Sequence, residues 1–206
     1  VGGVFIQAES ETSAINMLFG AAATGQRTMT STSSTGYSLM MEGISNLAGS
    51  NVPAVIELVM RMGPGGGGID TSQLDYTSTT KGGAHGGYHT LVFAPWSCQE
   101  LYDLTQLAFY LADKYRHPVI ILADGTLAQM MEPVEPRPIE FHQPLPPKTW
   151  ALTGMGGKRR KNIVSSGLMT PEVAEAFHLS IQAKYAQMTR EEIRYEMRGL
   201  EDAEIV

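Results

Sequence analysis

The stretch "SCQELYDLTQLAFYLADKYRHPVIILADG", residues 97–125, contains the start of a helix, the helix itself and a strand. Ser97 and Glu100 form a capping box, which satisfies backbone N–H groups at a helix start. The apolar positions that follow share one helical face: Leu101, Leu104, Ala108, Leu111 and Tyr115. Residues 118–124 are apolar in succession, which is typical of a parallel strand covered on both faces. The stretch therefore predicts an α/β fold.

The same alternation of short apolar runs and helical patterns extends toward the N-terminus. Ser10 can cap a helix that ends near Gly25, and a second, weaker helix is expected over residues 37–48. The predicted strands are 3–7, 27–32, 54–60, 89–94 and 118–124. Residues 1–132 are thus expected to form a parallel sheet flanked by helices.

The remainder of the chain is expected to differ from this sheet domain. Residues 133–147 hold six prolines, a density that suits an extended arm within a linker over 133–150. In the tail, 151–206, Thr170 followed by Pro171 indicates a helix start, and Thr189 with Glu192 indicates another, so a helical hairpin is predicted. Because the chain opens without methionine and closes on an apolar pair, we expect a fragment, incomplete at its N-terminus and leading into a further domain.

Composition narrows the classes of partner. Charged residues make up 17% of the chain, against about 25% in ordinary soluble domains, which indicates surface hidden in an assembly; a large self-contained core is the alternative. The net charge of -6 argues against nucleic acid, and no apolar run is long enough to span a membrane. One cysteine excludes an intrachain disulfide and an iron–sulfur cluster held by this chain alone. A cytoplasmic location is expected.

Ligands of parallel α/β sheets bind beyond the carboxyl ends of the strands, which directs attention to the residues that follow each strand. These residues are 9–11, 33–36, 61–68 and 124–125. The run "GPGGGG" at 63–68 formally matches GxGxxG, but it contains a proline and no GK[ST] follows, so a flexible loop is the plainer interpretation. The histidines lack metal-ligand spacing, and no metal is predicted on this chain.

Three side chains near these positions are candidates for chemistry. Glu11 is either an ordinary acid of a first helical turn or, in a dry pocket, a carboxyl that holds or shares a proton. Arg61 ends a strand and can clamp a carboxylate through two parallel hydrogen bonds; a surface arginine is the alternative. His85 lies in a second glycine-rich loop, where a solvated histidine is the alternative to a ligand contact.

Four runs in order resemble the alpha subunit of 2-oxoacid:ferredoxin oxidoreductases, in particular the branched-chain (2-oxoisovalerate, 3-methyl-2-oxobutanoate) type. They are "GGVFIQAESETSAINMLFGAAATGQRTMTSTSSTGYSLMMEGIS", "VMRMGPGGGGIDTSQLDY", "KGGAHGGYHTLVFAPWSCQELYDLT" and "LADKYRHPVIILADGTLAQMMEPVE". The likeness is dense over residues 1–135. The family's "YPITP"-type segment, which precedes these runs, is not in the sequence, and Ser34-Thr35-Gly36 replaces the family's "SGPG" or "SSPG". The "GGPSTGLPT" usual in the 2-oxoglutarate type is also replaced, by "MGPGGGGIDTS".

The resemblance implies a pyrimidine-binding domain for thiamine diphosphate. The family's glutamate that matches Glu11 hydrogen-bonds the aminopyrimidine ring, and the arginine that matches Arg61 steadies the substrate carboxylate. The loops 63–68 and 82–87, the second of which contains His85, would flank the substrate entrance. The implied activity is oxidative decarboxylation of a branched-chain 2-oxoacid to acyl-CoA and CO2 with reduction of ferredoxin.

The resemblance also implies partners. A beta subunit would share the cofactor and hold its diphosphate and Mg²⁺, a small ferredoxin-like subunit and other partner chains would carry iron–sulfur clusters, and ferredoxin and coenzyme A would be co-substrates. Activity would require the beta subunit. Two alternatives stay open at the level of sequence. One is the beta half of a pyruvate-dehydrogenase-type or transketolase-type enzyme, and the other is a non-catalytic α/β scaffold subunit.

Overall fold

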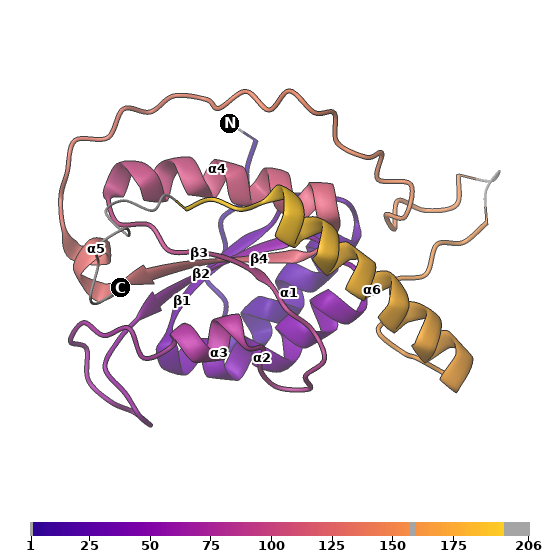
Figure 1. Ribbon diagram of the computed structural model, residues 1–206, viewed down its shortest axis with the longest axis horizontal. Helices are drawn as coiled ribbons and strands as arrows, with labels where there is room; N and C mark the ends of the chain where they lie inside the picture. The colour runs from indigo at the N-terminus through magenta and orange to yellow at the C-terminus, as the bar shows by residue number, and fades with distance from the viewer. Residues whose placement is uncertain (1, 157–159, 196–206) are drawn as a thin grey trace, which may run out of the picture. The chain divides into compact units, whose positions relative to one another are not determined.

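The computed structural model describes residues 2–156 and 160–195. Its sheet has four strands in the order β1-β2-β4-β3, and every neighbouring pair is parallel (Figure 1). The strands are β1 (Met29–Ser33), β2 (Ala54–Met60), β3 (Leu91–Phe93) and β4 (Pro118–Asp124). The predicted parallel α/β architecture is confirmed, and the two central strands have the bounds that their apolar runs predict.

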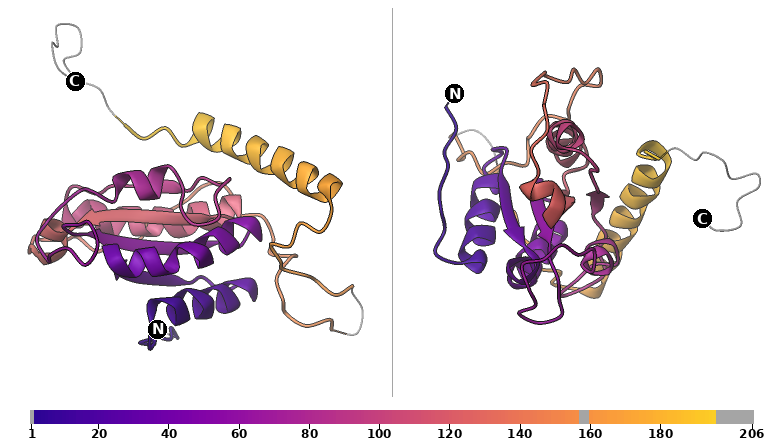
Figure 2. Two further views of the ribbon diagram at one scale, coloured as in Figure 1. Left: turned by 90° about the horizontal axis from the view of Figure 1, so that it is seen from below. Right: turned by 90° about the vertical axis from the view of Figure 1, so that its left-hand side faces the viewer.

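Helices cover both faces of the sheet (Figures 1 and 2). On one face α1 (Glu11–Ala23) and α2 (Ser34–Gly49) enclose a core with alternate residues of β2 and β4, among them Ile56, Leu58, Ile120 and Leu122. On the other face α4 (Cys98–Tyr115) packs on β2 and β4. Two short helices, α3 (Tyr76–Thr80) and α5 (Gly125–Gln129), belong to the same compact unit, Val1–Gly167. Burial on both faces explains the unbroken apolar character of the central strands.

Capping residues begin three of the long helices where the sequence predicts. The Ser10 side chain accepts a hydrogen bond from the Ser13 N–H at 3.2 Å at the start of α1. Ser97 accepts from the Glu100 N–H at 3.1 Å at the start of α4. Thr170 caps α6 (Pro171–Glu191), which belongs to a second compact unit, residues 168–206. Each cap satisfies one of the N–H groups that a helix start leaves open.

Some predicted elements differ in the structure. Residues 3–7 form no strand, because among the described residues no strand pairs with them and a strand requires a backbone partner; Phe5 is 97% exposed. Helix α2 begins at Ser34, three residues before its predicted start. Helix α6 continues through Thr189, so this threonine is not a cap, and the rest of the predicted hairpin extends into 196–206, outside the described residues.

The proline-rich arm, residues 133–147, has neither helix nor strand and is held against α4. Gln99 and Gln106 each form two hydrogen bonds with the arm's backbone, and the Tyr110 hydroxyl donates to the Gln143 carbonyl at 3.2 Å. The rings of Tyr110 and Phe141 stack with centroids 4.3 Å apart. The arm is therefore part of the first compact unit, while the predicted divisions at 132 and 150 stay predictions. Among the described residues no helix could cross a membrane.

Candidate functional site

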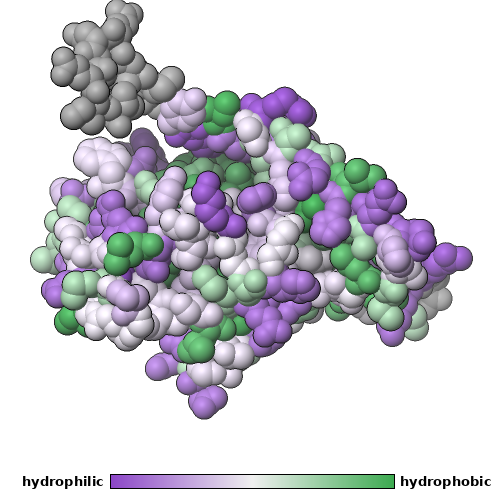
Figure 3. Space-filling model, turned by 60° about the horizontal axis from the view of Figure 1, so that its bottom comes forward, coloured by the Kyte–Doolittle hydropathy of each residue, from purple (hydrophilic) through white to green (hydrophobic). Residues whose placement is uncertain are grey.

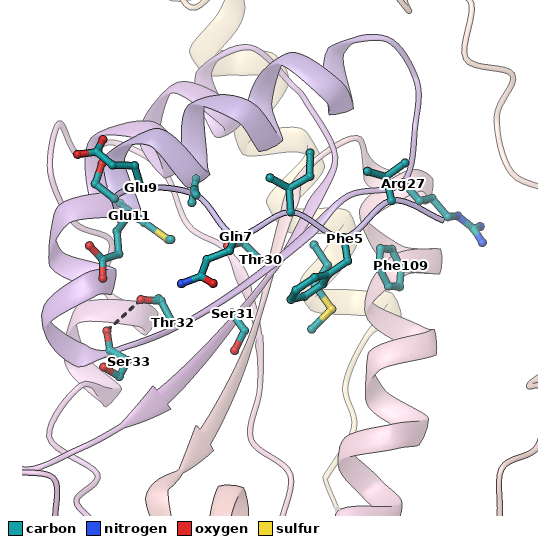
Figure 4. A pocket seen from close by; sticks show the side chains of 17 residues that line it. Phe5, Gln7, Glu9, Glu11, Arg27, Thr30, Ser31, Thr32, Ser33 and Phe109 are labelled. Carbon is teal, nitrogen blue, oxygen red and sulfur yellow. Dashed lines mark hydrogen bonds between the residues drawn. The ribbon is translucent and has the colours of Figure 1, made fainter. Parts of the chain in front are cut away.

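A pocket of about 970 Å³ lies between residues 4–11 and β1 (Figure 4). Side chains that carry hydroxyl, amide or carboxyl groups line one part of it: Gln7, Glu11, Ser31, Thr32 and Ser33. Apolar side chains, among them Phe5 and Phe109, line another part (Figure 4). A ligand with a flat apolar body and a polar edge matches this division. The pocket reaches the carboxyl end of β1, where the sequence predicts a site.

Glu11 is placed by the start of α1, of which it is the first residue. Its side chain is half-buried and points toward the end of β1, whereas Glu9 is exposed and points away (Figure 4). A Cβ atom on Gly36 would lie 2.8 Å from Glu11 Cγ and 2.9 Å from its Oε1. Gly36 therefore leaves the space that the carboxylate occupies, beside the first turn of α2, where the helix dipole favours negative charge.

The dry pocket expected around Glu11 is only partly provided by this chain. The side chain keeps some exposure, and the pocket that it lines is open. Among the described residues no hydrogen bond to the Glu11 carboxylate is found, so its oxygens face the pocket without a protein donor. Fuller desolvation of this group needs a ligand, another chain, or both.

Arg61 follows β2 and is anchored at both its backbone and its side chain. Its backbone N–H donates to Ser34 Oγ at 2.9 Å, and its Nη2 donates to Thr35 Oγ1 at 2.9 Å and to the Gly66 carbonyl at 3.3 Å. A second pocket of about 260 Å³ is lined by Arg61, by the start of α2 and by residues 62–65 and 74–75. Arg61 Nε is buried and has no partner among the described residues.

Glu11 and Arg61 both lie beside the first turn of α2. Thr35 receives the guanidinium of Arg61, and the next residue, Gly36, adjoins the carboxylate of Glu11. The structure therefore brings these two predicted residues to one place, the start of α2. The carboxylate and the guanidinium thus lie beside three successive small residues, Ser34, Thr35 and Gly36.

His85 lies elsewhere. Its side chain is exposed, and its carbonyl oxygen accepts a hydrogen bond from Ser45 Oγ at 2.6 Å. Ser45 is three turns along α2 from Ser34, a distance of about 16 Å at 1.5 Å per residue. This contact ties the loop 82–87 to the body of α2. The structure does not bring His85 into the pocket of either Glu11 or Arg61.

The glycine loop 63–68 closes on itself instead of leading into a helix. The Gly68 N–H donates to the Met62 carbonyl at 2.9 Å, and the Met62 N–H donates to the Asp70 carbonyl at 2.9 Å. Gly67 has φ of +55°, and a Cβ there would lie 1.8 Å from the Met62 oxygen, so this turn requires glycine. Without a helix N-terminus behind it, the loop lacks the phosphate-binding geometry of a GxGxxG turn.

Sequence reasoning missed several residues of the site. The sequence predicts residues 33–36, but Thr30, Ser31 and Thr32, which precede them and line the larger pocket, could also have been noticed as a polar tract near a strand end. Asp75 accepts a very short hydrogen bond from Ser34 Oγ, and no local pattern predicts this contact because 41 residues separate the two. Among the described residues no group of three His, Cys, Asp or Glu could hold a metal.

A buried phenol lies directly behind the site. Tyr37, 2% exposed, follows Gly36 in α2. Burial raises the pKa of its hydroxyl well above the ordinary value, and the neighbouring Tyr88 and Asp75 raise this pKa further. Burial likewise raises the pKa of Tyr88. Both side chains therefore stay neutral at physiological pH and serve the core cluster that supports the first turn of α2.

Comparison with known proteins identifies the family of the chain. Residues 1–197 match the family model described as pyruvate flavodoxin/ferredoxin oxidoreductase, thiamine diphosphate-binding. The chain is 52% identical over its whole length to the ketoisovalerate oxidoreductase subunit VorB of Methanothermobacter marburgensis. It is 39% identical, over 65% of its length, to the 2-oxoglutarate synthase subunit KorA of Methanocaldococcus jannaschii, of which the match covers 37%.

A solved structure supports the same family. The 2-oxoglutarate:ferredoxin oxidoreductase from Magnetococcus marinus, solved with 2-oxoglutarate, coenzyme A and succinyl-CoA bound, matches 97% of this chain and 39% of its own with a TM-score of 0.78 and 26% identity. The chain spans 58% of the length of the VorB relative. On the match of residues 1–197, the chain belongs to the thiamine-diphosphate-binding family of pyruvate flavodoxin/ferredoxin oxidoreductases.

Proposed function

We propose that this chain is the alpha-type subunit of a 2-oxoacid:ferredoxin oxidoreductase that converts a branched-chain 2-oxoacid, of the 2-oxoisovalerate type, to acyl-CoA and CO2. One observation carries the proposal: the Glu11 carboxylate faces a pocket of about 970 Å³ from a position that Gly36 keeps clear. The relatives named as ketoisovalerate oxidoreductase subunits support the choice of substrate.

The residues of this pocket fit the aminopyrimidine end of thiamine diphosphate. A flat heteroaromatic ring has an apolar face and polar edges, and the pocket offers Phe5 and Phe109 together with Gln7 and Glu11. When bound, the cofactor supplies a carbon nucleophile that makes decarboxylation of a 2-oxoacid possible. This chain's contribution to binding would be Glu11 at a ring nitrogen, with the hydroxyl groups of β1 beside it.

The role of Glu11 in this proposal is to hold a proton at the ring nitrogen that it contacts. A ligand and a partner chain that cover the pocket would remove the remaining water around the carboxylate. In such a setting a hydrogen bond between a carboxyl and a ring nitrogen gains strength, because the local dielectric constant falls. Positioned proton transfer of this kind contributes about 10²–10⁴-fold to an enzymatic rate.

Arg61 would orient the 2-oxoacid. Its guanidinium lines the pocket of about 260 Å³, and its Nη2 is fixed by Thr35. A guanidinium binds a carboxylate through two parallel hydrogen bonds, and this geometry fixes both distance and direction. Met62, Pro64 and Leu74 line the same pocket and offer an apolar surface to an aliphatic side chain.

Other components would come from other chains. We infer that a beta subunit holds the diphosphate and Mg²⁺, and that electrons leave through iron–sulfur clusters on partner chains, including a small ferredoxin-like subunit, to ferredoxin. Coenzyme A would accept the acyl group. The family supports ferredoxin as acceptor, and the Magnetococcus marinus neighbour has coenzyme A bound.

The experiment that tests this function compares Glu11→Gln with Glu42→Gln in the assembled enzyme. Glu11→Gln keeps the size of the side chain but removes its acid–base capacity, so we expect 2-oxoisovalerate-dependent ferredoxin reduction to fall about 100-fold or more. Glu42, exposed on α2 and lining neither pocket, provides the matched control and is expected to retain activity. Near-normal turnover by Glu11→Gln would refute the role given to this carboxyl.

A further inference from the structure

Asp75 occupies a helix N-cap position without capping its helix. It immediately precedes α3 (Tyr76–Thr80), yet its side chain accepts no hydrogen bond from that helix. Aspartate at this position ordinarily accepts from an N–H of the first turn and stabilises the helix. The carboxylate instead accepts a very short hydrogen bond from Ser34 Oγ. The side chain thus gives up a local contact for a partner on another element.

The hydroxyl of Ser34 links Asp75 to Arg61. Ser34 Oγ accepts a hydrogen bond from the Arg61 backbone N–H at 2.9 Å. Its single proton has two acceptors within reach, the Asp75 carboxylate and the Arg61 carbonyl oxygen at 3.4 Å. The carboxylate contact is shorter and charge-assisted, so it takes the proton. This leaves a lone pair of the hydroxyl directed at the Arg61 N–H.

We propose that Asp75 is a positioning residue that acts through Ser34 to set Arg61 in the orientation that receives the substrate carboxylate. Arg61 lies just beyond the last residue of β2 that pairs with β4, and its isolated backbone bridge with Thr71 leaves its N–H to donate to Ser34. With the backbone fixed, the guanidinium reaches Thr35 at 2.9 Å. This inference rests on the proposed function, because it assigns a use to the orientation of Arg61.

Sequence position gives Asp75 a second connection to the site. Ser34 and Thr35 are the first two residues of α2, and Gly36, which adjoins Glu11, is the third. The Asp75–Ser34 hydrogen bond therefore also fixes the turn that makes room for the Glu11 carboxylate. Asp75 contacts neither Glu11 nor the Arg61 guanidinium through any hydrogen bond found among the described residues. Asp75 also lines the pocket of about 260 Å³ beside Arg61, and its proposed action on Arg61 passes through Ser34.

The test uses the enzyme isolated with the chains that co-purify with it. Asp75→Ala and Ser34→Ala each remove one end of the Asp75–Ser34 contact, and both are expected to raise KM for the 2-oxoacid about tenfold with kcat changed less than twofold. Tenfold corresponds to about 1.4 kcal/mol, within the range for one hydrogen bond. The double variant is expected to match either single one, because the two residues act in series. Ser34→Thr, which keeps the hydroxyl, is expected to restore KM.

A second measurement reports on the contact without turnover. Amide hydrogen exchange at Arg61 is expected to be at least tenfold faster in Asp75→Ala and Ser34→Ala than in the parent enzyme. Asp103→Ala, which removes an acid from α4, is the control and is expected to leave exchange at Arg61 and KM unchanged.

The outcomes separate the two proposals. Unchanged exchange at Arg61 overturns the positioning role, and so does faster exchange with unchanged KM. A lower KM, as expected if Asp75 mainly repels the substrate carboxylate, overturns it as well. A parent enzyme that oxidises no 2-oxoacid contradicts the proposed function, whereas the exchange rates still decide whether Asp75 holds Arg61 in place.

Discussion

At the scale of single residues, the site depends on the absence of a side chain. Gly36 lies between Thr32 and Glu11, and a Cβ there would be 2.1 Å from Thr32 Oγ1 and 2.9 Å from Glu11 Oε1. Real Cβ atoms do not tolerate such separations, so any other residue displaces the carboxylate or the end of β1. The small residues at 34–36 thus serve the placement of Glu11 and Arg61.

Gly36→Ala is expected to lower turnover by at least tenfold, because it displaces the Glu11 carboxylate from the pocket. Gly20→Ala is the matched control, since a Cβ on Gly20 in α1 meets nothing within 4 Å. That change is expected to stabilise the helix by up to about 1 kcal/mol and to leave turnover unchanged. Steady-state rates and unfolding curves of both variants measure the two effects. Full activity in Gly36→Ala would show that the glycine is not needed to seat the carboxylate.

Tyr37 predicts how stability depends on alkaline pH. Burial raises the pKa of its hydroxyl in the folded state, whereas in the unfolded chain tyrosine titrates at about 10. The folded state therefore favours the neutral phenol, so this stabilisation is fully present below pH 10 and is lost as pH rises above it. Tyr37→Phe is expected to reduce the fall in unfolding midpoint between pH 9 and pH 11. Tyr76→Phe, at an exposed position, should behave like the parent; an unchanged fall in Tyr37→Phe would contradict the assignment.

At the scale of elements, the sequence predicts correctly the helices and strands whose signals are local, and it fails where an element needs a partner from elsewhere in the chain. The bounds of β2 and β4 could be predicted because burial on both faces makes a strand continuously apolar. Helices α1 and α4 could be predicted because their caps are local. Residues 3–7 have strand composition, but a strand also needs a partner, which composition does not reveal.

The same limit applies to the site. Glu11 and Arg61 could be found because each stands at the end of an element that the sequence defines. Asp75 could not, because its role depends on Ser34, 41 residues away. The position of His85 depends in the same way on a distant residue, Ser45 of α2, which donates a hydrogen bond to its carbonyl oxygen. Residues whose role comes from long-range contacts require the folded structure.

The elements are also joined by a buried charge. Asp113 of α4, with 4% of its side chain exposed, accepts from Arg27 Nε at 2.9 Å and from Lys148 Nζ at 2.6 Å. Lys148 also donates to the Gly25 carbonyl at 2.9 Å. This cluster fastens two segments to one helix: residues 25–27, which connect α1 to β1, and the chain beyond the arm.

Asp113→Asn is expected to lower the free energy of unfolding by about 2 kcal/mol. This estimate is below the 3–5 kcal/mol typical of broken buried pairs, because Arg27 is 54% exposed and can turn toward water. Asp103→Asn breaks a 3.8 Å surface pair with Arg137 and is expected to cost less than about 1 kcal/mol. Chemical denaturation measures both. Equal costs for the two variants would show that burial of Asp113 adds nothing.

At the scale of the whole molecule, the surface combines few charges with exposed apolar side chains. Phe5, Ile69 and Met131 are 97%, 82% and 97% exposed. On the face drawn in Figure 3, hydrophobic residues are scattered among polar ones rather than gathered in one patch. With 17% charged residues, the chain has fewer charges than a typical soluble domain. Together with subunit relatives, this pattern favours burial of part of the surface against other chains.

Phe5 and Ile69 are therefore expected to be protected in the assembled enzyme. Both lie beside the pockets, Phe5 in the wall of the larger one and Ile69 in the loop that follows Arg61. Hydroxyl-radical labelling of the two side chains is expected to be several-fold slower in the assembly than after its chains are separated. Met17, exposed on α1, provides a reference. Equal labelling of Phe5 and Ile69 in both samples would place the interface elsewhere.

The way in which α4 holds the arm has a consequence for variation. The hydrogen bonds that join Gln99, Gln106 and Tyr110 to the arm all involve main-chain groups of the arm, at positions 135, 137, 139 and 143. These contacts therefore depend on the backbone conformation of the arm and not on its side chains, apart from Phe141, whose ring stacks on Tyr110. In homologues the amino-acid sequence of the arm should accordingly vary widely while its number of residues stays constant. Gln99, Gln106 and Tyr110 on α4 should vary least.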